Sequence, residues 1–225
     1  MTGVRSRLRI PAVILISGRG SNMMALVQAA ASPDYPIEFV AIIANRPNAP
    51  GVEWARERGI KTIVIDHTSY DSRAEFDESL DKAISACRAE LIVCAGFMRI
   101  LTGEFVSRWA NRLINIHPSL LPAFKGLNTH SRALEAGVKI SGCTVHFVTP
   151  ELDTGPIIAQ AAVPVLPFDT PETLANRTLQ AEHVIYPEAL RLVAEAFDSP
   201  GNSGQIAHDL ASGRQVLYSL YINKL

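Results

Sequence analysis

The chain has 225 residues, of which 48% are apolar and 19% charged, and its formal net charge is −1. This composition is ordinary for a globular protein and argues against disorder. The 21 basic and 22 acidic residues nearly balance, so the total charge does not indicate nucleic acid as a partner. No stretch approaches the roughly 18 apolar residues of a membrane span. Cys87, Cys94 and Cys143 lack CxxC spacing and favour reduced thiols in a cytoplasmic protein.

Short runs rich in Val and Ile alternate with longer amphipathic stretches over the first half of the chain. This alternation is typical of βα units and a mainly parallel sheet. The expected strands are 12–17, 38–44, 62–65, 91–95 and 112–116, and the expected helices are 21–31, 52–58, 72–88 and 103–109. Because the strands are almost continuously apolar, we predict an α/β fold with helices on both faces of the sheet.

The second half of the chain departs from the βα pattern. A helix over 129–136 is expected to end at Gly137, a residue suited to a left-handed cap. Two strands, 142–149 and 156–165, follow and are joined by a loop.

A long helix is expected next, with Thr170 as its N-cap and Pro171 at its first position. Pro187 is predicted to kink this helix or end it early. We therefore predict one domain over 1–197 and a short tail over 198–225, for which a small hairpin is one interpretation.

The residues directly after the first expected strand are the first candidate for binding. Gly20, Ser21 and Asn22 open a helix, where free backbone N–H groups attract an anion. Met23 stands where a dinucleotide fingerprint would have its third glycine, and no GK[ST] follows. The pattern therefore favours a phosphate monoester. The alternative is a plain tight turn with Ser21 as the helix cap.

The end of the fifth expected strand is the second candidate. Asn115 and His117 are two residues apart and so point to the same side of an extended strand. A carboxamide can donate to a carbonyl oxygen that gains negative charge, and an imidazole can move protons near neutral pH. Pro118 and Pro122 stiffen the loop that follows. Together these features favour a catalytic pair over a structural histidine.

Two further segments complete the candidates. Asp153 lies in the loop between the later strands, where it is either a turn residue or a carboxylate that orients His117 and favours its charged form. Residues 96–101 follow the fourth strand and either line a pocket for a flat ring or cover the core. Histidines at 117, 130, 146 and 183 show no HExxH or comparable spacing, so a metal site is not favoured.

Several motifs occur together in a fixed order: Ile16-Ser17-Gly18-x-Gly20-Ser21-Asn22, Ala95-Gly96-Phe97-Met98-Arg99-Ile100-Leu101, Asn115-Ile116-His117-Pro118-Ser119-Leu120-Leu121-Pro122, and Leu152-Asp153-x-Gly155-Pro156. With Gln180-Ala181-Glu182-His183, they resemble the folate-dependent phosphoribosylglycinamide formyltransferase family over roughly residues 10 to 195.

This resemblance implies a Rossmann-like fold, no metal, and formyl transfer from 10-formyltetrahydrofolate to glycinamide ribonucleotide. It implies that Gly20, Ser21 and Asn22 hold the ribose phosphate and that Glu182 contacts the ribonucleotide. It implies that the folate contacts are Arg73, Met98, Arg99, Ile100, Leu101 and Asn115. It implies that His117 transfers protons, Asn115 polarises the formyl carbonyl, and Asp153 acts on His117.

Other activities remain open at this point. Ala123-Phe124-Lys125-Gly126 also resembles formyltetrahydrofolate hydrolase, which has the same three catalytic residue types. The 28 residues beyond Phe197 are fewer than the basic C-terminal domain that methionyl-tRNA formyltransferase uses. A non-catalytic binding module is the alternative from another class. The sequence does not fix the oligomeric state, so a homo-oligomer stays open.

Overall fold

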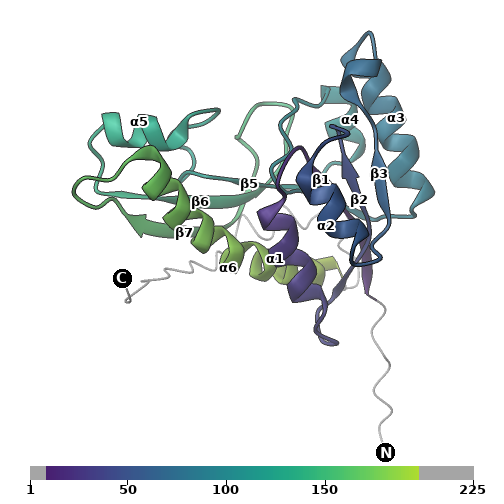
Figure 1. Ribbon diagram of the computed structural model, residues 1–225, viewed down its shortest axis with the longest axis horizontal. Helices are drawn as coiled ribbons and strands as arrows, with labels where there is room; N and C mark the ends of the chain where they lie inside the picture. The colour runs from purple at the N-terminus through teal and green to yellow at the C-terminus, as the bar shows by residue number, and fades with distance from the viewer. Residues whose placement is uncertain (1–8, 198–225) are drawn as a thin grey trace, which may run out of the picture.

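The computed structural model describes residues 9–197, which form one seven-stranded sheet with helices packed against it (Figure 1). The strand order is β3-β2-β1-β4-β5-β6-β7. Strands β1 to β5 are parallel, whereas β6 runs antiparallel to β5 and β7 antiparallel to β6. The mainly parallel α/β sheet predicted from the sequence is therefore confirmed. The hairpin considered for the tail lies outside the described residues.

The elements follow the predicted order closely. The strands are β1 Ile10–Ile16, β2 Ile37–Ala44, β3 Thr62–Val64, β4 Leu91–Cys94, β5 Leu113–His117, β6 Ile140–Phe147 and β7 Ile157–Pro164. The helices are α1 Ser21–Ala30, α2 Pro50–Arg56, α3 Arg73–Ala86, α4 Gly103–Arg108, α5 Thr129–Glu135 and α6 Pro171–Phe197, and a 3₁₀ turn, η1, spans His67–Ser69.

The two faces of the sheet carry separate apolar clusters because successive side chains of a strand point to opposite faces. On β1, Ile14 and Ile16 pack with residues of α1, α2, α5 and α6. Val13 and Leu15 instead pack with residues of α3 and α4. All four side chains are fully buried. Helices therefore cover both faces, as the continuous apolar strands predicted.

The strand order reverses between β1 and β4, which are neighbours in the sheet. Strands β2 and β3 are added on one side of β1, and β4 and β5 on the other. In open α/β sheets, ligands bind in the crevice outside the carboxyl ends of the strands at such a point. The segments that follow β1 and β4 meet there, because the Ser17 amide donates to the Gly96 carbonyl at 3.1 Å.

Helix α6 packs against α1 and against strands β6 and β7. The Thr173 amide donates to the Thr170 hydroxyl at 3.3 Å, which confirms the predicted N-cap. The helix continues for ten residues past Pro187, so the prediction that it ends early is wrong. Buried contacts on both sides of Pro187, including a hydrogen bond of 2.9 Å from the Tyr35 hydroxyl to its carbonyl, offset the missing N–H.

Two remaining sequence expectations concern cysteines and membranes. Cys87, Cys94 and Cys143 are free thiols, and burial raises the pKa of Cys94 to about 12. Within residues 9–197, none of the helices combines the length and apolar character needed to cross a bilayer.

Candidate active site

Strand β5 presents Asn115 and His117 at its carboxyl end, where they face the neighbouring strand β6. Asn115 lies opposite His146 and His117 lies opposite Thr144 in the antiparallel register. His117 is 6% exposed, so its imidazole is almost completely shielded from water. The spacing of two residues therefore places both side chains on one side, as predicted.

The His117 imidazole lies between two oxygen acceptors. Its Nδ1 is 3.4 Å from the Asp153 Oδ2, and its Nε2 is 3.0 Å from the Phe124 carbonyl oxygen. Because a carbonyl oxygen can only accept a hydrogen bond, Nε2 carries a proton and donates a hydrogen bond to the Phe124 carbonyl. When Nδ1 also carries a proton, that N–H lies next to the Asp153 carboxylate. The predicted meeting of Asp153 and His117 is thus present in the structure.

Asp153 is held in place by the backbone of two loops. It has φ 52°, in the left-handed region, so the turn interpretation and the contact with His117 are both correct. Its Oδ2 also accepts from the Gly126 amide at 2.8 Å. Two residues later, a Cβ on Gly155 would lie 1.7 Å from the Phe147 carbonyl oxygen. Glycine at 155 is therefore required for the close approach that positions this loop.

The loop after His117 is fastened to the antiparallel strands by buried side chains. The Thr144 hydroxyl donates to the Ser119 carbonyl at 2.7 Å and accepts from the Leu121 amide at 3.0 Å. The Gln160 amide donates to the Leu121 carbonyl and to the Thr144 hydroxyl, both at 2.9 Å. These bonds fix the backbone that ends at Phe124 and so fix the partner of His117. Sequence analysis did not identify Thr144 or Gln160.

His146 is a further member of the site that the sequence analysis missed as a site residue. Its Nδ1 is 2.9 Å from the Phe147 carbonyl oxygen, so this nitrogen is the donor. Its Nε2 lies 3.3 Å from Asn115 Nδ2 and 3.8 Å from Asp153 Oδ1. Burial lowers the pKa of His146, which favours the neutral ring. The neutral Nε2 accepts one N–H of Asn115 and leaves the other N–H of that amide for a ligand.

The glycine loop after β1 lies beside α6. Gly20, with φ 72°, is the N-cap of α1, and no side chain caps that helix, so Ser21 is not the cap. The Asn22 Nδ2 donates to Glu182 Oε2 at 2.6 Å, which joins two of the residues predicted to bind one substrate. Burial raises the pKa of Glu182 from 4.5 to about 7, against the opposing effect of the Asn22 hydrogen bond.

The segment after β4 contains the predicted folate contacts. Met98 is 65% exposed and Ile100 58% exposed, so two large apolar side chains of this segment are accessible to a ligand. The Met98 amide donates to the Ser17 hydroxyl at 2.7 Å, so the segments after β4 and β1 are fixed to each other.

Helix α3 borders the same segment. The Arg99 guanidinium lies over the Phe76 ring at 4.3 Å, and Phe76 belongs to α3. Arg73 is exposed at the start of α3, and no contact within residues 9–197 joins it to the other predicted site residues. Leu101 belongs to the same loop and packs against the apolar cluster of α3 and α4.

The described residues do not gather three or more His, Cys, Asp or Glu side chains in an arrangement that could hold a metal ion. The site instead combines a carboxamide, an imidazole and a carboxylate. It lies at the carboxyl ends of a mainly parallel sheet, next to a glycine loop at a helix start. This arrangement defines an α/β enzyme that acts on a carbonyl group next to an anionic substrate.

The chain belongs to the formyl transferase family, whose model matches residues 10–190. It is 44% identical to the phosphoribosylglycinamide formyltransferase of Escherichia coli, over 81% of this chain and 86% of that protein. It is 48% identical to the trifunctional purine biosynthetic protein adenosine-3 of Gallus gallus, over 88% of this chain. That match spans 20% of the Gallus protein, so this chain corresponds to about a fifth of such relatives.

Solved structures agree with this assignment. The phosphoribosylglycinamide formyltransferase of Coxiella burnetii matches with a TM-score of 0.79 and 48% identity, over 83% of this chain and 88% of that one. The glycinamide ribonucleotide transformylase 1 of Symbiobacterium toebii matches with a TM-score of 0.81 and 47% identity, over the same shares of the two chains. The Rossmann-like fold implied by the sequence motifs is confirmed.

Proposed function

We propose that this protein transfers the formyl group of 10-formyltetrahydrofolate to the amine of N1-(5-phosphoribosyl)glycinamide, in de novo purine biosynthesis. The observation that carries the proposal is the contact of His117 with Asp153 beside Asn115. The similarity of the chain to proteins named for this activity supports it. The reaction requires two bound substrates, and the site has two flanking subsites. A cytoplasmic location is part of the same proposal.

The chemistry follows from the three side chains. The amine nitrogen attacks the formyl carbon, and the carbonyl oxygen becomes an oxyanion. The free N–H of Asn115 donates to that oxyanion, and removing such a donor costs about 10²–10³ in rate. The new N–C bond forms, the bond from carbon to the folate nitrogen breaks, and one proton passes from the substrate ammonium to the leaving nitrogen. His117 assists this proton transfer as a general acid–base catalyst. Such assistance raises the reaction rate by about 10²–10⁴-fold.

One hydrogen bond must change for His117 to act. Its Nε2 donates to the Phe124 carbonyl in the structure, while Nδ1 faces Asp153. Substrate binding has to exchange the Phe124 bond for a bond to substrate or water. Asp153 keeps the ring oriented during that exchange, and it is itself held by the Gly126 amide.

The ribonucleotide subsite lies at the start of α1. Gly20, Ser21 and Asn22 supply backbone and side-chain donors for the phosphate, and α1 has ten residues with its N-terminus at this loop. Asn22 Oδ1 is buried and lacks a hydrogen-bond partner within the described residues, so it is free to accept from substrate. Glu182, bonded to Asn22, contacts the same substrate.

The folate subsite lies at the segment after β4, with Arg73, Met98, Arg99, Ile100, Leu101 and Asn115 as its contacts. Two further exposed apolar residues, Leu127 and Leu152, occur in loops that flank His117 and Asp153. The loops of Gly126 and Leu152 lie close together, because a Cβ on Gly126 would be in van der Waals contact with the Leu152 side chain, at 3.8 Å. Exposed apolar side chains around a polar centre suit a flat heterocycle.

The test is formation of the formylated ribonucleotide from 10-formyltetrahydrofolate by the purified full chain. We expect His117→Ala and Asp153→Asn to lower kcat by about 10²–10⁴. Asp81→Asn is the matched control, because Asp81 also pairs with a basic residue, Arg108 at 2.7 Å, but lies on α3 away from this site. Release of formate at the same rate without ribonucleotide would contradict transfer and support the hydrolase.

A further inference from the structure

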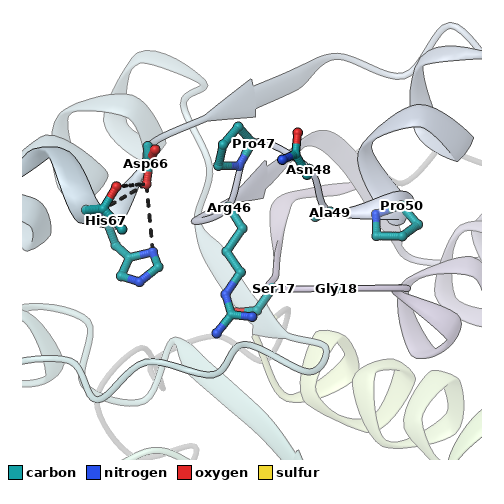
Figure 2. Close-up of a pocket in the computed structure, with 10 residues that line it drawn as sticks. Ser17, Gly18, Arg46, Pro47, Asn48, Ala49, Pro50, Asp66 and His67 are labelled. Atoms are coloured by element: carbon teal, nitrogen blue, oxygen red, sulfur yellow. Dashed lines mark hydrogen bonds and ion pairs between the residues drawn. The ribbon is translucent and has the colours of Figure 1, made fainter.

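The glycine loop between β1 and α1 lies against the first turn of α2. Gly18 follows β1 and lines the same pocket as Ala49 and Pro50, which cap and begin α2 (Figure 2). The next residue of the helix, Gly51, is bound to the loop directly, because its amide donates to the Gly18 carbonyl at 3.1 Å. Helix α2 therefore supports the loop that supplies the proposed phosphate donors.

Gly51 leaves no room for a side chain at this contact. A Cβ there would lie 3.0 Å from the Arg19 carbonyl oxygen, 3.1 Å from the Gly18 carbonyl oxygen and 2.8 Å from the Ile16 Cδ1. All three separations are shorter than the 3.4–4 Å of an ordinary van der Waals contact. The φ of Gly51 is not in the left-handed region. Glycine is therefore required here for space and not for backbone conformation.

The start of α2 is fixed by its packing, so the loop is the part that would move if residue 51 were larger. Val52 and Ala55 are buried in the apolar cluster that also contains Ile16. Arg19, in contrast, is exposed in the loop. A methyl group at position 51 would therefore displace the loop carbonyls by a few tenths of an ångström.

Displacement of these carbonyls would turn a donor of the proposed phosphate subsite. A peptide unit is planar, so the Arg19 carbonyl oxygen and the Gly20 N–H move together. The Gly20 N–H makes no hydrogen bond within residues 9–197, so it is free to donate to a ligand. Because a hydrogen bond weakens as its angle departs from linear, rotation of this unit would weaken a bond from Gly20 to phosphate.

We propose that Gly51 is a positioning residue for the phosphate of the ribonucleotide: the close contact of α2 with the glycine loop holds the Gly20 N–H in the direction in which phosphate binds. The inference rests on the proposed function, because it takes the phosphate subsite from there. It also assigns a specificity. The contact made by Gly51 favours acceptors that carry the 5′-phosphate over glycinamide riboside, which lacks it.

The test compares formyl transfer to glycinamide ribonucleotide and to glycinamide riboside by the unmodified protein and by Gly51→Ala. We expect Gly51→Ala to raise the KM for the ribonucleotide about 10-fold, the size expected when one hydrogen bond to a charged group is lost. The KM for the riboside should not change, because this acceptor has no phosphate to hold. The kcat and the KM for the formyl donor should also stay the same, because the proposed catalytic pair lies on β5.

Gly103→Ala is the matched control. Gly103 begins α4, and a Cβ there would have the Pro150 Cβ at 3.8 Å as its nearest contact, so the added methyl group fits. This variant should have the KM values of the unmodified protein for both acceptors.

Ile16→Val separates an effect on the loop from an effect on the core. Valine lacks the Cδ1 that a Cβ at position 51 would contact, so the double variant Ile16→Val/Gly51→Ala keeps only the contacts with the loop carbonyls. It also relieves the core if Gly51→Ala alone does not fold. The double variant should show the same rise in the KM for the ribonucleotide. A KM restored to that of Ile16→Val would assign the loss to core packing and overturn the inference.

The remaining outcomes distinguish this inference from the proposed function. An unchanged KM for the ribonucleotide in Gly51→Ala, or an equal loss with the riboside, would overturn the role of Gly51. Absence of transfer to the ribonucleotide by the unmodified protein would instead overturn the proposed function. Inorganic phosphate tests the loop in either case, because a bound anion raises the Tm. The rise should be smaller in Gly51→Ala than in the unmodified protein, and equal effects of phosphate on the two proteins would also overturn the inference.

Discussion

Replacing Glu182 with glutamine removes a buried carboxyl group whose pKa burial raises from 4.5 to about 7. Glutamine has nearly the same shape and can still accept from Asn22, which donates to Glu182 at 2.6 Å. The substitution therefore tests the ionisation of this carboxyl group with little change in packing.

The sign and size of the effect follow from the two pKa values. Below pH 4.5 the carboxyl group is protonated in both the folded and the unfolded protein, so its ionisation does not change the free energy of unfolding. Between pH 4.5 and 7 the unfolded chain releases the proton while the folded chain keeps it, so the free energy of unfolding falls as pH rises. A rise of the pKa from 4.5 to about 7 corresponds to about 3 kcal/mol.

The assay is chemical denaturation of the unmodified protein and Glu182→Gln between pH 4 and 8. We expect the variant to gain about 3 kcal/mol relative to the unmodified protein across this range, with most of the change between pH 4.5 and 7. A constant offset between the two proteins reflects hydrogen bonding and is independent of the ionisation of Glu182. A difference that stays constant with pH would refute the view that burial dominates the environment of Glu182.

Three further substitutions test other parts of the site. Gly155→Ala would place a Cβ 1.7 Å from the Phe147 carbonyl oxygen, so the Asp153 loop must move, and formyl transfer should fall about 10²-fold; an unchanged rate would show that the loop position is unimportant. Thr144→Val leaves the buried partners of its hydroxyl unpaired and should lower the free energy of unfolding by about 1–3 kcal/mol in urea denaturation, and a smaller loss would count against that network. Because burial lowers the pKa of His146, the unmodified protein should lose stability relative to His146→Gln as pH falls below 6.5, and parallel stability curves would contradict a buried neutral ring.

The sequence predicted much of the fold because the strands are recognisable locally. The continuous apolar strands fixed the mainly parallel sheet and its two helical layers, since a strand buried on both faces has few polar positions. Of the two effects predicted for Pro187, the early end of the helix is excluded, because the packing of α6 keeps the helix intact beyond this residue. Its neighbours Ile185, Tyr186 and Leu190 are fully buried, and this packing offsets a cost of about 3 kcal/mol.

The catalytic pair on β5 was predictable for the same local reason, whereas its partners were not. Asn115 and His117 lie on one strand, and their spacing alone puts them on one side. The position of Asp153 depends on the loop between β6 and β7, and that of His146 on the register of β6 against β5. Register between strands distant in sequence is a tertiary property. The sequence analysis therefore considered His146 only as a possible metal ligand, because its pairing with Asn115 depends on that register.

The hydrogen bond between Ser17 and Met98 could not be predicted from the sequence either, because it too depends on the tertiary structure. It joins residues 81 positions apart, across the point where the strand order reverses. The glycine loop and the segment after β4 were identified separately from sequence, but their attachment to each other depends on the topology of the sheet.

We propose that His117, Asp153 and Asn115 act as one unit on a single formyl carbon. Single-turnover formyl transfer by His117→Ala, Asp153→Asn and the double variant tests it most directly. If Asp153 acts through the imidazole, the double variant should be no slower than His117→Ala by more than a few-fold, because residues that act together show strongly non-additive losses. Losses that multiply in the double variant would mean that the two side chains act independently, and would contradict the account.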